Sequence, residues 1–216
     1  DLTATAMDFN GTVTISGDTT LEDGADLITA SAGTSNVRVG VNAGNSITSG
    51  GNYNVVVGDE AGTALTTGDQ NVAVGYQALD ALDTAIRNVA IGTTALTSDT
   101  KGDASVAVGH SALYAQNFTT TTSVYNVAVG YHAGVNVTTG LRNNFIGGLA
   151  GDATTDADDN IALGYNALGA NTVGSRSVAV GTDALATQNP ATATDMYNTA
   201  VGYDAGQEIT TGIDNT

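Results

Sequence analysis

The sequence predicts an all-β chain, a parallel β-solenoid or β-roll of about ten coils with 17 residues in most coils. Three observations lead to this prediction. A unit of the form Asn-Val-Ala-Val-Gly-x-x-Ala occurs ten times, its branched residues recur with period two, and a glycine follows each short apolar run. Period-two alternation is typical of a strand, and glycine permits the tight turn that ends it.

The repeat has a nearly constant length. Most steps between units are 17 residues, with one step of 18 and two of 21. The units open at Asn36, Asn54, Asn71, Asn88, Ser105, Asn126, Asn143, Asn160, Ser177 and Asn198. A 17-residue unit is too short for a helical hairpin repeat, which needs more than about 30 residues. The pattern restarts after every four units, which gives a super-repeat of 72 residues.

The chain divides into two parts. Residues 1–35 contain a short alternating stretch bounded by glycines, which predicts a β-rich shaft or neck segment. Residues 36–216 carry the repeats and form the solenoid domain. A further unit would begin at Asn215, so we expect the repeat to continue beyond the end of this sequence.

Each position of the unit, numbered from the Asn or Ser that opens it, has an expected role. We expect positions two and four to fill the core, the position-five glycine to turn the chain, and the position-one amides to form a ladder. Two units show these positions and the alanine at position eight: Asn71, Val72, Val74, Gly75 and Ala78, then Asn126, Val127, Val129, Gly130 and Ala133. Coils spaced by ~4.8 Å would stack into a rod of roughly 48 Å.

Position three lies on the opposite side of the strand and is nevertheless apolar. It is alanine in seven units, at Ala73, Ala90, Ala107, Ala128, Ala162, Ala179 and Ala200. A strand that is apolar on both faces is buried on both. Because a slender coil has one interior, the sequence predicts that this alanine face meets identical chains, and a homotrimer fits best.

The segments Asn71–Ala78 and Asn126–Ala133 resemble the head repeat of trimeric autotransporter adhesins and related repeats of phage tail fibres. The resemblance covers residues 36–216 and implies a left-handed parallel β-roll that associates as a trimer. The repeat here is longer than the adhesin repeat, which implies a longer outer turn. Within residues 1–35, the stretch Gly11–Gly17 is similar to the shaft segments of phage tail fibres.

Composition excludes several classes of function. The net charge is −17, with 22 acidic and five basic residues, whereas nucleic-acid binding requires a cationic surface. The same charge disfavours anionic membrane surfaces, and the absence of an apolar run of 18 residues excludes a membrane-spanning helix. The chain has no cysteine, which excludes thiol nucleophiles and disulfides.

The sequence offers few residues for catalysis or cofactor binding, and we expect no enzyme and no cofactor. His110 and His132 fall in turns after glycine and are expected to be exposed turn residues. Asp156, Asp158 and Asp159 are a weak calcium candidate, because this run lacks the glycine and distal glutamate of an EF-hand. A polar turn is the alternative interpretation of this run.

The two long steps contain inserts, and insertions in solenoids often form a binding face. Candidate receptor contacts are Tyr114, Phe118, Thr120 and Pro190. The alternative is a spacer loop without a partner. The tyrosines at position six, such as Tyr131 and Tyr165, are expected to pack partly against the roll.

The repeat therefore favours a structural fibre segment, a phage tail fibre involved in host attachment and located on the virion. The alternative is an extracellular bacterial adhesin of the trimeric autotransporter type. Either would bind itself as a homotrimer, and a host surface glycan or protein receptor is a further candidate partner. A polysaccharide-degrading spike is the enzymatic alternative, although acid pairs such as Asp59 with Glu60 do not recur and lack a tryptophan platform. An ice-binding solenoid would need a threonine ladder on every coil, whereas Thr-Thr-Gly recurs mainly once in four coils.

Overall fold

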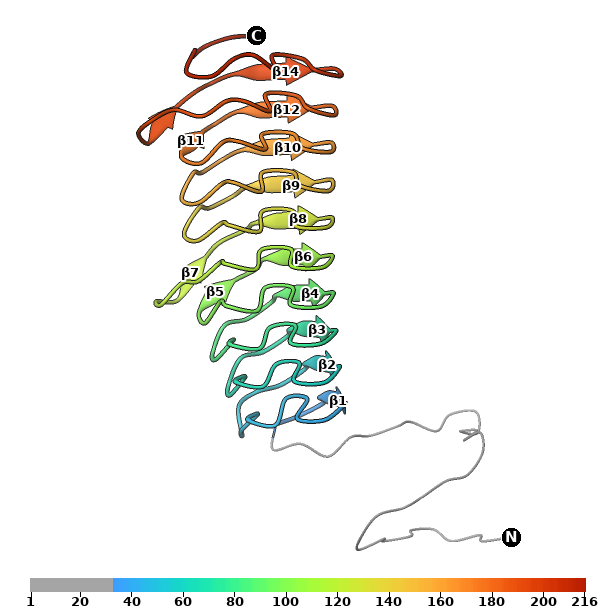
Figure 1. Cartoon of the computed structure of the whole chain (residues 1–216). Helices are drawn as coiled ribbons and strands as arrows, with labels where there is room; N and C mark the ends of the chain where they lie inside the picture. The colour runs from blue at the N-terminus through green and yellow to red at the C-terminus, as the bar shows by residue number, and fades with distance from the viewer. Residues whose placement is uncertain (1–32) are drawn as a thin grey trace, which may run out of the picture.

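A computed structural model describes residues 33–216, so most of the shaft segment predicted for residues 1–35 lies outside the described residues. The described part is all-β, and no helix occurs within it. About ten coils, some 17 residues apart, stack into an elongated column (Figure 1). The parallel β-solenoid that the repeat predicts is therefore confirmed.

Each coil contributes one strand to a single ten-stranded parallel sheet. The strands are β1 (Val37–Val39), β2 (Val55–Val57), β3 (Val72–Val74), β4 (Val89–Ile91), β6 (Val106–Val108), β8 (Val127–Val129), β9 (Asn144–Ile146), β10 (Ile161–Leu163), β12 (Val178–Val180) and β14 (Thr199–Val201). Equivalent positions pair directly, so that Val72 lies opposite Val89 and Ala73 opposite Ala90. The sequence repeat thus becomes a set of straight columns of equivalent side chains.

The two long coils add small sheets at the opposite end of the coil (Figure 1). Strand β5 (Gly102–Asp103) pairs with β7 (Thr122–Ser123), and β11 (Gly174–Ser175) pairs with β13 (Thr194–Asp195). Phe118 and Pro190 occupy equivalent places in the two inserts and both are buried. Each insert therefore folds back onto the column and is anchored there.

The position-five glycines turn the chain as predicted. All ten have positive φ angles, from 131° at Gly75 to 143° at Gly130. A Cβ atom added to Gly75 would lie 2.6 Å from the carbonyl oxygen of Gly92 in the next coil. The close approach of successive coils and the backbone angle both require glycine at this position.

The structure corrects the expected assignment of the two strand faces. The position-three alanines point into the coil and are buried in the hydrophobic core of the single chain. The seven are Ala73, Ala90, Ala107, Ala128, Ala162, Ala179 and Ala200. Positions two and four, which were expected in the core, face outward instead. The predicted alanine trimer face is therefore the interior of the roll.

Coil thickness explains why alanine faces inward. Five coils place a leucine at position nine, and each of these coils has alanine at position three. The leucines are Leu79, Leu96, Leu113, Leu168 and Leu185, all fully buried. A thin coil has room for one large and one small side chain across its interior, since protein interiors are close-packed.

The position-one amides link the two sides of each coil. Asn71 Nδ2 donates to the carbonyl oxygen of Ala85 across the coil at 2.9 Å. Its Oδ1 accepts the backbone N–H of Asn88 in the next coil, also at 2.9 Å. The expected amide ladder is thus present as a chain of side-chain-to-backbone bonds, and these asparagines are buried.

Candidate functional site

The outward face of the ten-stranded sheet is the largest feature that the fold leaves without an intrachain role. All of its residues at positions two and four are Val, Ile or Leu except Asn144 and Thr199. Several are well exposed in the single chain, including Val39 at 49% and Leu163 at 43%. Ten strands of three residues make a strip of about 500 Å², the upper range for an apolar patch on a soluble monomer.

A column of charged side chains flanks this face at the start of the strands. Arg142 Nε lies 2.6 Å from Asp159 Oδ1, and Arg176 Nη1 lies 2.5 Å from Asp195 Oδ2. The hydrogen bond and charge of Arg142 lower the pKa of Asp159. Both partners are partly exposed, so this network contributes little to the stability of the single chain.

The weak calcium candidate does not assemble into a site. The Asp158 Oδ1 atom accepts the backbone N–H of Leu141 at 2.7 Å, and Asp159 pairs with Arg142. Within residues 33–216, no three His, Cys, Asp or Glu side chains come together as metal ligands would. Asp156 bonds to its neighbour Thr155, as a polar turn residue does.

The structure groups two histidines and a tyrosine that the sequence left separate. The ring centroids of Tyr131 and His132 lie 4.0 Å apart with an interplanar angle of 8°. The His110 ring stacks on both, 5.6 Å from each. These residues occupy positions six and seven of adjacent coils, so the column arrangement could have predicted their contact. The position-six tyrosines are exposed, from Tyr76 at 46% to Tyr203 at 76%, which corrects the expected partial packing.

A carboxylate lies near this aromatic cluster. Burial raises the pKa of the Asp152 carboxyl, and the charge of nearby His132 opposes the rise. Asn136 Nδ2 donates to the backbone carbonyl of Asp152 at 2.8 Å and so ties this turn to the preceding coil.

The predicted receptor contacts separate into two groups. Tyr114 is 44% exposed and Thr120 is exposed. Phe118 and Pro190 are buried beneath their own inserts. The four residues therefore do not form one exposed patch, because the apolar residues anchor the inserts.

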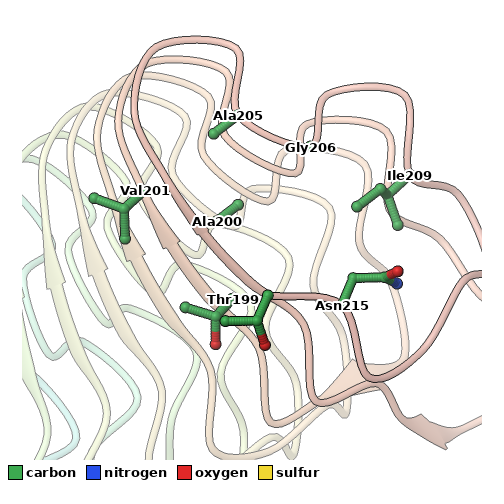
Figure 2. A pocket seen from close by; sticks show the side chains of 8 residues that line it. Thr199, Ala200, Val201, Ala205, Gly206, Ile209 and Asn215 are labelled. Atoms are coloured by element: carbon green, nitrogen blue, oxygen red, sulfur yellow. The ribbon is translucent and has the colours of Figure 1, made fainter.

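A hollow of about 280 Å³ lies at the end of the column beside β14. Figure 2 shows that its lining includes Ala200, Ala205, Gly206 and Ile209. Equivalent positions in the preceding coils are covered by the next coil, so the hollow is the end of the core and offers no catalytic group.

No family model matches the chain, and the searches of curated proteins and of solved structures found no match. In the part of the chain that the structure describes, no helix is long and apolar enough to cross a membrane.

Proposed function

We propose that this chain is a structural segment of an extracellular phage tail fibre, that it associates as a homotrimer, and that it takes part in host attachment. The observation that supports this proposal is the apolar outer face of the ten-stranded sheet. The resemblance of the repeat to tail-fibre and trimeric adhesin repeats favours three chains in parallel.

Association is favoured by the hydrophobic effect. Burying a half-exposed valine or isoleucine contributes about 1 kcal/mol, and the face offers such a side chain at nearly every outward position. Summed along the column, this contribution is large compared with the stability of an ordinary domain. The face is therefore expected to be covered in the working protein.

The best partner for this face is a second copy of the chain. A parallel copy has the same coil spacing, so its outward side chains can interdigitate with this column along its full length. A partner with another repeat spacing would lose register within a few coils. Three flat faces around a common axis form a closed cyclic assembly, which also leaves no apolar face in water.

The mass of the chain in solution tests this proposal. Light scattering should give about three times the 21.4 kDa of one chain. Replacing Val106 and Val108 with glutamate should lower the mass to that of a monomer, because six carboxylates would meet at the axis. The matched control replaces Thr120 and Thr139, which are exposed outside the main sheet, and should remain trimeric.

A wild-type monomer at micromolar concentration would refute self-association. A mass of two chains would refute the trimer and show that two sheets pair face to face.

A further inference from the structure

The aromatic cluster of His110, Tyr131 and His132 has no role in the fold described so far. Its three rings are nearly parallel and lie on the turns that follow β6 and β8. Tyr131 is 57% exposed and His110 is also exposed. The stack therefore presents aromatic surface to solvent at one point of the column.

The coil next to this stack lacks a side chain at the equivalent place. Gly148 is the one glycine among the ten residues at position six. It lies between Tyr131 and Tyr165, whose positions are two coils, roughly 10 Å, apart. A Cβ atom on Gly148 would lie 3.6 Å from Tyr165 Cδ2, which is ordinary contact. Thus fold stability does not require glycine at this position, and its effect is to leave the aromatic surface uncovered.

Polar groups adjoin the aromatic surface. The Asp152 carboxylate is near enough to His132 for their charges to interact, and the Asp152 side chain is partly buried. A carboxylate accepts hydrogen bonds from hydroxyl groups, and imidazole nitrogens donate or accept them. An apolar surface with a few fixed polar groups is the usual composition of a small-ligand site.

We propose that His110, Tyr131, His132, Gly148 and Asp152 form a binding site for a neutral pyranose sugar, the sugar platform. The C–H face of the sugar stacks on the Tyr131 and His132 rings above Gly148, and sugar hydroxyls donate to Asp152. The net charge of −17 disfavours anionic sugars. This inference rests on the proposed role in host attachment, since it names a ligand class for that role, but it does not require the outer face of the sheet.

Nuclear magnetic resonance with simple sugars tests the platform. The probes are methyl β-galactopyranoside, methyl α-glucopyranoside and N-acetylglucosamine, each titrated into the full chain at millimolar concentration. At least one should receive saturation transfer from the protein and shift the ring signals of both histidines, which are the only two in the chain.

Two variants locate the site without altering the turn. Gly148→Thr places a side chain over the stack, and Tyr131→Thr removes the central ring. Threonine already occupies position six at Thr93 and Thr182, so both variants are compatible with the fold. Each should weaken binding about tenfold or more. The control is Tyr76→Thr, the same substitution in a column position beside Glu60, which should bind as the wild type does.

Absence of transfer and of histidine shifts with all three probes would overturn the sugar platform. Binding that survives both Gly148→Thr and Tyr131→Thr would also overturn it. Light scattering on the same samples separates this result from self-association. A trimer that binds no sugar refutes only the platform, and a monomer that binds sugar refutes only the trimer.

Discussion

At the scale of single residues, the core balances the volumes of positions three and nine. Where position three is large, position nine of the same coil is glycine, as in Val56 with Gly62 and Phe145 with Gly151. A Cβ atom on Gly151 would lie 2.6 Å from Phe145 Cε1. The two positions therefore compete for the same space, and their sizes are coupled.

This coupling predicts a rescue. Phe145→Ala should lower the free energy of unfolding by about 3–5 kcal/mol through the cavity it leaves. Gly151→Leu alone should cost about 2–3 kcal/mol through overpacking. Combining them recreates the alanine–leucine pair of five other coils, whose leucines share positive φ angles of 49° to 54°. The double variant should regain at least half of the loss in urea titrations followed by circular dichroism. Additive losses would contradict the coupling.

The same residues show what sequence patterns can and cannot predict. Period-two alternation identified the strands, their number and the turning glycines, because these depend on local backbone geometry. It could not assign the faces, since alanine and valine are both apolar. The inverse sizes of positions three and nine carried that information, because only side chains that share an interior need compensating volumes. The aromatic cluster was missed because its members come from two coils.

At the scale of the coil, the long inserts depend on a buried polar network. The two units that open with serine instead of asparagine are also the two that carry inserts. In the first, Gln116 Nε2 donates to Ser105 Oγ at 3.1 Å and to Asp99 Oδ2 at 2.5 Å. Gln116 Oε1 accepts from Asn126 Nδ2 at 2.9 Å. The glutamine thus continues the amide ladder where the asparagine is missing.

Gln116→Leu should therefore destabilise the chain by about 2–3 kcal/mol, because several buried polar atoms lose their partner. The matched comparison is the unit of Asn71, where Leu82 fills the place equivalent to Gln116. Adding Ser105→Asn to Gln116→Leu recreates that arrangement and should recover part of the loss in thermal melts. Unchanged stability of Gln116→Leu alone would show that the network is dispensable.

The inserts also explain an error of prediction at this scale. Exposed aromatic and apolar residues were expected at the insert tips, where a receptor could reach them. The structure buries Phe118 and Pro190 and exposes the threonines around them. A four-residue insertion must anchor itself to the column to avoid the entropic cost of ordering a free loop, and its few apolar residues serve as the anchor.

At the scale of the whole molecule, the column is modular because each coil contacts only its neighbours. Stability is then a sum over coils and their interfaces, and the 72-residue period is the unit that can be removed without changing any contact type. Deleting residues 105–176 joins Ala104 to Ser177, the equivalent of Ser105. This variant should keep the strand signal in circular dichroism per residue, form the same oligomer as the full chain, and unfold at a lower temperature.

The control is a deletion one residue longer, 105–177. It removes the position-one side chain and shortens the following connection, so the next strand must either lose its stacking or turn its alanine outward. We expect this variant to melt well below the 72-residue deletion and to aggregate, since a turned strand would place valines in a space fitted to alanine. Equal stability of the two deletions would mean that the register of the columns does not hold the fold together, contrary to the direct pairing of equivalent positions along the whole sheet.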